Sequence, residues 1–146
     1  MPPDDIGQPA ISRHLKVLTK PEFVKKWLLG PPSMPVCDID LRVGGRYRYV
    51  WRNDFDWSEF GEQGQFREIA PPHRLAHTES MDGARGEALC TSTFVESGAQ
   101  TLFTLNLLFE SREARDGALQ SGTTEGMSMS YDGLQDFVNN EQTLIT

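Results

Sequence analysis

The feature that most constrains the fold is a series of short segments in which apolar and polar residues alternate. In residues 37–43, CDIDLRV, every second residue is apolar and the residues between are charged. In residues 46–52, RYRYVWR, three aromatic side chains share one face and arginines the other. Successive side chains of a strand point to opposite faces, so this period of two is typical of a half-buried strand. The pattern predicts a sheet with one face against a core.

Further strands follow the same pattern and are separated by glycine, proline and polar residues. We expect residues 53–64, NDFDWSEFGEQG, to form a loop because the segment is polar and contains glycines. Residues 31–35, PPSMP, predict a stiff loop. The later strands are predicted at residues 65–70, 74–80, 87–96 and 100–110, with turns at 44–45, 71–74 and 97–98.

Helical spacing of apolar residues replaces the alternation at both ends of the chain. It predicts a helix at residues 9–18 and a second at 19–30, with Thr19 as N-cap and Gly30 as terminator. Residues 111–122 predict a short helix or a loop, opened by a serine cap. A long terminal helix is expected at residues 123–140, with an apolar stripe of Met127, Tyr131, Leu134 and Val138.

The order of these elements predicts one α+β domain over residues 1–146. Its economical form is a curved antiparallel sheet whose concave face is covered by the long terminal helix, with two short helices near the N-terminus.

The charge and cysteine content limit the classes of function. The net charge of −7 disfavours general binding to nucleic acid, although all four lysines lie in the first 30 residues. A solvated helix face accounts for that basic front better than a docking surface does. No apolar run is long enough to cross a bilayer, and no signal peptide is evident, so we expect a cytoplasmic protein. Cys37 and Cys90 match no metal-site spacing and are expected to be free thiols.

Four phrases, in this order, resemble one protein family. They are TKPEFVKKWLLGPP, MPVCDIDLRVGGRYRYVWR, GQFREIAPPHRLAHTE and SREARDGALQSGTTEGMSMSYDGL, covering about residues 19–138. The family is the bacterial one related to the activator of the heat-shock-protein-ninety ATPase, within the SRPBCC or START-type helix-grip superfamily. The resemblance implies a curved sheet that grips the C-terminal helix, with a ligand cavity between them.

The N-terminus departs from that family. Its members begin with a strand of the form R-x-F-x-A-P, and here residues 1–8, MPPDDIGQ, show no apolar alternation. Residues 6–18, IGQPAISRHLKVL, resemble instead the recognition helix of arsenic-repressor-type regulators. A helix-turn-helix also needs a preceding helix, which this stretch lacks, so DNA binding is disfavoured. A missing first strand would leave a sheet edge unpaired, which predicts a homodimer or a swapped N-terminus.

No motif in the sequence points to catalysis, a metal or another cofactor. His73 and His77 have no evident third metal ligand, and Asp38 and Asp40 belong to a charged stripe that is better explained by solvation. The candidates for lining a cavity are the aromatic and apolar residues that the predicted faces turn inward, with His77 as an inward polar group. They are Trp27, Tyr47, Tyr49, Trp51, His77, Phe103, Leu105, Met127 and Tyr131.

Each of these candidates also has a purely structural interpretation. Aromatic residues at alternate strand positions usually fill a core, and a lone histidine on such a face is usually hydrogen-bonded and inert. The preferred function is a carrier or sensor that binds a small apolar or aromatic molecule without turnover. The alternative is a partner-binding module that uses the basic front, as the chaperone-activator resemblance implies. A cyclase or dehydratase using His77 with Tyr49 or Tyr131, and a DNA-linked regulator, are less favoured.

Overall fold

The structure is a computed structural model that describes residues 17–28, 33–84, 86–98, 100–120 and 123–140. Most of the predicted helix at residues 9–18, the N-terminal departure at residues 1–8 and the terminator Gly30 lie outside these ranges. In chain order the elements are α2 (Pro21–Trp27), β1 (Ser33–Ile39), β2 (Arg46–Arg52), β3 (Glu59–Ala70), β4 (Arg74–Met81), β5 (Ala88–Ser97), β6 (Gln100–Leu108), α3 (Arg112–Gln120) and α4 (Thr123–Asn140).

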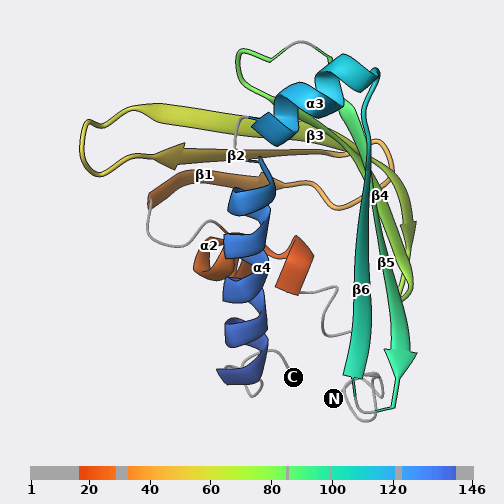
Figure 1. The fold of residues 1–146 in the computed structure, drawn as a ribbon. Coiled ribbons are helices and arrows are strands. Elements are labelled where there is room, and N and C mark those ends of the chain that lie inside the picture. Colours follow the sequence, from red (N-terminus) through yellow and green to blue (C-terminus); the bar gives the residue numbers. More distant parts are fainter. Residues whose placement is uncertain (1–16, 29–32, 85, 99, 121–122, 141–146) are drawn as a thin grey trace.

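The strands of the described part form one antiparallel sheet in the order β1-β2-β3-β4-β5-β6. Every strand pairs with its neighbour in the chain, so only short connections are needed. Figure 1 shows the sheet bent around α4, which stands in its hollow beside α2. The predicted α+β helix-grip architecture is therefore confirmed.

Two strands, β1 and β3, differ most from their predicted bounds. The alternating pattern continues to residue 43, but β1 ends at Ile39. The chain turns after this point, where the amide of Gly45 donates to the carbonyl of Arg42 at 2.8 Å. Leu41 and Val43 are consequently 43% and 62% exposed. At its other end β1 extends into the predicted loop at residues 31–35.

The second difference matters more for the site. β3 begins at Glu59, inside the segment predicted to be a loop, because residues 59–65 pair with the whole of β2. Only residues 53–58 remain between the strands.

The helices follow the sequence pattern, but α2 is shorter than predicted, since it ends at Trp27 with Leu28 at the C-cap. Thr19 is buried and precedes Lys20, which is the residue at the N-cap of α2 and makes no side-chain cap. The helical alternative for residues 111–122 is the one observed as α3, where the Ser111 hydroxyl accepts a hydrogen bond from the Ala114 amide at 3.0 Å. α4 spans the predicted 18 residues. None of the described helices is long and apolar enough to cross a membrane.

Two buried clusters hold the elements together. The first lies on the sheet and joins four residues from β2 to β5: Tyr47, Phe66, Leu75 and Phe94. The second joins α2, β1 and α4, and contains Val17, Val24, Trp27, Cys37 and Phe137. The second cluster fixes α4 against α2, so that the helix stands over the sheet without filling all the space beneath it.

Candidate functional site

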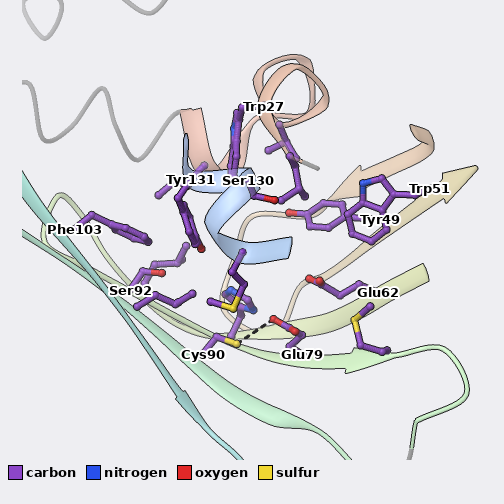
Figure 2. Close-up of a pocket in the computed structure, with 18 of the residues that line it drawn as sticks. Trp27, Tyr49, Trp51, Glu62, Glu79, Cys90, Ser92, Phe103, Ser130 and Tyr131 are labelled. Carbon is purple, nitrogen blue, oxygen red and sulfur yellow. Dashed lines mark hydrogen bonds between the residues drawn. The ribbon is translucent and has the colours of Figure 1, made fainter. Parts of the chain in front are cut away.

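A cavity of about 560 Å³ lies between the inner face of the sheet and the helices α2 and α4 (Figure 2). This volume is within the range of roughly 300–1,000 Å³ typical of small-molecule sites. The residues that line it come from every described helix and strand except β1 and α3: Leu18, Val24, Trp27, Leu28, Tyr49, Trp51, Phe60, Glu62, Leu75, His77, Glu79, Met81, Cys90, Ser92, Phe103, Leu105, Met127, Ser130 and Tyr131.

Aromatic rings form two sides of the cavity. On the helical side, Trp27 stacks on Tyr131 with ring centroids 6.1 Å apart, and its indole N–H donates to the carbonyl of Val17 at 2.9 Å. On the sheet side, Trp51 stacks on Phe60 at 5.0 Å. These contacts fix large flat surfaces that a ring of a ligand could pack against.

Two glutamates form the polar end of the cavity. Glu62 of β3 and Glu79 of β4 both line it, and Figure 2 shows their carboxyl groups turned toward the same region. The Tyr47 hydroxyl lies 3.0 Å from Oε2 of Glu62, and the Cys90 thiol donates to Oε2 of Glu79 at 3.3 Å. Burial and the neighbouring Glu79 carboxylate raise the pKa of Glu62 to about 8.

The hydrogen bonds around Tyr47 agree with a protonated Glu62. The Tyr47 hydroxyl also lies 3.0 Å from the carbonyl oxygen of Thr78, which can only accept. One hydroxyl proton cannot serve both acceptors fully. If Glu62 carries a proton, it donates to the tyrosine oxygen while the tyrosine donates to Thr78, and every group is satisfied. Neutral Glu62 is therefore the form that this arrangement favours near pH 7.

His77 is held as a neutral ring. Its Nδ1 lies 3.0 Å from the carbonyl oxygen of Thr78, and because a carbonyl only accepts, Nδ1 must carry the proton. Burial lowers the pKa of His77. The ring packs edge-on against Tyr47 with centroids 5.1 Å apart. This arrangement leaves Nε2 as an acceptor, so the polar end of the cavity is rich in acceptors.

The structure brings together eight of the nine residues predicted to line a cavity. Tyr47 is the exception: it lies in the sheet cluster, and only its hydroxyl reaches the polar end through Glu62. Asp38 and Asp40 are exposed, as expected of a solvated stripe. Cys37 and Cys90 are both free, as predicted. Among the described residues no cluster of His, Cys, Asp and Glu could hold a metal ion.

Sequence reasoning missed the acidic residues of the site. Glu62 falls in the segment predicted to be a loop, for which alternation predicts no inward face. Glu79 follows Leu75 and His77 at alternate positions of β4, and that spacing could have found it. The sequence predicts only that Cys90 is a free thiol, although Cys90 lines the cavity at the position paired with His77.

Comparison with known proteins places the chain in a family. The sequence model described as "Activator of Hsp90 ATPase homolog 1-like protein" matches residues 15–139. No curated protein matches the chain in sequence.

Solved bacterial structures share the fold. One from Rhodobacter sphaeroides is 27% identical, with a TM-score of 0.79 over 88% of this chain and 84% of that one. Another from Nitrosomonas europaea is 23% identical, with a TM-score of 0.80 over 91% and 89% of the two chains. A third from Mycobacterium smegmatis is 23% identical, with a TM-score of 0.77 over 88% and 83%.

Proposed function

The chain belongs to the family of activator of Hsp90 ATPase homolog 1-like proteins, and we propose that it binds a small, largely apolar molecule between its sheet and α4. The observation that carries the proposal is the cavity of about 560 Å³. Its walls are mostly aromatic and aliphatic, with a few polar groups that include Glu62 and Glu79, which is the usual composition of a small-molecule site. The role is that of a carrier or sensor without turnover.

The aromatic pairs in the cavity walls indicate the shape of the apolar part of the ligand. Trp51 and Phe60 present a stacked pair on the sheet, and Trp27 and Tyr131 present another on the helices. A flat aromatic or alicyclic molecule can contact both. Met127 lines the cavity too, and its flexible thioether lets one pocket accept ligands of different outline.

The basic front of the chain supports the partner-binding alternative less well. Lys25 and Lys26 are exposed in the last turn of α2, where lysines also stabilise the negative end of the helix. The ammonium of Lys26 lies 5.9 Å from the centroid of the Phe137 ring. A solvated helix end therefore accounts for both lysines without a partner.

A cavity-filling substitution tests the proposal. Leu105 lines the cavity, whereas Leu108 on the same strand is 67% exposed on the opposite face. A thermal-shift screen would cover fatty acids, flavonoids, sterols and polyketide-like aromatics. We expect at least one compound to raise the melting temperature of the parent and of Leu108→Trp, but not of Leu105→Trp. No shift from any compound, or an unchanged shift in Leu105→Trp, would overturn the proposal.

A further inference from the structure

The polar end of the cavity has an excess of hydrogen-bond acceptors and negative charge. Among the described residues that line it are two glutamates, Glu62 and Glu79, and no lysine or arginine. Near pH 7 the groups that hydrogen-bond to these carboxyl groups are neutral: Tyr47 accepts from the protonated Glu62, and the Cys90 thiol donates only weakly to Glu79. Carboxylates enclosed by protein are normally paired with a cation.

We infer that the ligand carries a protonated amine on its apolar body, and that the ammonium group binds between Glu62 and Glu79. The inference rests on the proposed function and narrows it to one class of ligand. An ammonium supplies both the missing positive charge and up to three N–H donors. Charge-assisted hydrogen bonds to carboxylates are roughly twice as strong as neutral ones.

The surroundings of the carboxyl groups suit a cation with an apolar body better than they suit other head groups. Tyr49 is the strand neighbour of Glu62, and its ring lies 6.0 Å from that of Trp51. Ring faces attract a cation that has been removed from water. A carboxylate or phosphate head group would be repelled by the Glu79 carboxylate. A hydroxyl could donate only one hydrogen bond and would leave the charge of Glu79 uncompensated.

Binding of an amine would displace a proton from the cavity. Burial and Glu79 keep Glu62 largely protonated below pH 8, and a cation beside it favours the ionised form. The other titratable groups that face this end are neutral near pH 7. They are Tyr47 and Tyr49 of β2, His77 of β4, Cys90 of β5 and Tyr131 of α4. Amine binding at pH 7 is therefore coupled to release of up to one proton from Glu62.

A matched pair of probes isolates the ammonium group. The probes are 2-(naphthalen-1-yl)ethylamine and 2-(naphthalen-1-yl)ethanol, which share the aromatic body and differ in the head group. Isothermal titration at pH 7 would give Kd for each, and titration of the amine in phosphate and in Tris would give the number of protons released. We expect the amine to bind the wild-type protein about tenfold more tightly than the alcohol, or better.

Isosteric variants then assign the preference to the glutamates. Glu62→Gln with Glu79→Gln should bind the two probes equally and release no proton. The control, Glu59→Gln with Glu68→Gln, replaces the same number of carboxyl groups at solvent-exposed positions of β3 that pair with Arg52 and Arg74. It should keep the wild-type preference.

Each outcome bears on a different claim. If the alcohol binds wild-type protein, is excluded by Leu105→Trp, and the amine binds no more tightly, the cavity function stands and the amine inference fails. The inference fails equally if the amine preference survives in the double glutamine variant. If neither probe binds, both the cavity function and the inference are wrong for this ligand body.

Discussion

The two ends of the inner face of the sheet are built by the same strands, yet one is filled and the other is hollow. At the filled end, Tyr47, Phe66 and Phe94 belong to one buried cluster. At the hollow end, Glu62 and Glu79 border a cavity of about 560 Å³. Phe66 and Glu62 lie four residues apart on β3 and share a face. The alternation of residues along each strand therefore determines which face of the sheet points inward. The position of α4 determines whether side chains fill the space over that face.

The position of α4 relative to the sheet is set by its contacts with α2 and β6. Phe23 of α2 contacts Phe137 with ring centroids 5.8 Å apart, and Phe103 of β6 contacts Tyr131 at 5.3 Å. These rings hold the helix at a distance from β3 and β4, where the carboxyl groups lie. A ligand in the cavity would contact residues of the sheet that α4 does not contact.

The largest expected effect is a difference in stability loss when an aromatic side chain is truncated at the filled end or beside the cavity. Phe66→Ala should lower the free energy of unfolding by about 3–5 kcal/mol, because its 3% exposed side chain leaves a void in a filled cluster. Phe103→Ala should cost about half as much, because Phe103 already borders the cavity and is only half-buried. Urea denaturation measures both. Equal losses would show that the cavity wall is packed as tightly as the core.

A smaller effect is expected at the boundary between the two ends. A Cβ at Gly64 would collide with the carbonyl oxygen of Thr78 and would lie 2.6 Å from Cε1 of Tyr47. Gly64→Ala should therefore cost about 3 kcal/mol and displace the Tyr47 hydroxyl from Glu62.

Gly117 provides the control for that substitution. It lies in α3, and a methyl group added there would meet no atom within 4 Å, so Gly117→Ala should stabilise the protein by up to about 1 kcal/mol. Thermal unfolding of both variants gives the comparison. A neutral Gly64→Ala would contradict the close crossing of Tyr47 over β3.

The sequence predicts the faces of the strands well where apolar residues mark them. β2 has the expected boundaries, and Tyr49 and Trp51 lie on the face that its alternation assigns to the interior. The same rule failed for β3, because Glu62 stands among glycines and polar residues that are typical of a loop. A carboxyl group on an inward face contradicts hydrophobic alternation, and this is the signature of a site rather than of a core.

The presence of the cavity could not be predicted from the alternation of residues in the strands. Phe66 and Phe103 are both aromatic residues on inward faces, but one fills the sheet cluster and the other lines the cavity. The difference depends on the distance between sheet and helix, which is set by contacts between residues far apart in the chain. The family resemblance supplied the expectation of a cavity, whereas periodicity alone did not.

The smallest expected effect concerns the proton on Glu62. Its pKa is about 8 in the folded protein and near 4.5 without the surroundings, so folding favours the protonated form. The free energy of unfolding should therefore decrease as the pH rises from about 4.5 to about 8, and it should level off above pH 8. The window of pH 7 to 8 avoids the opposite contribution of His77, whose lowered pKa affects stability below about pH 6.5.

Between pH 7 and 8 we expect the wild-type protein to lose about 1 kcal/mol more stability than Glu62→Gln, which keeps the neutral shape at every pH. Glu59→Gln, on the same strand but exposed and paired with Arg52 at 2.7 Å, should follow the wild-type slope. Urea denaturation at both pH values measures the three slopes. Parallel slopes for wild type and Glu62→Gln would mean that water enters the cavity freely enough to leave Glu62 an ordinary carboxylate, and the hollow end would then resemble the protein surface more than its core.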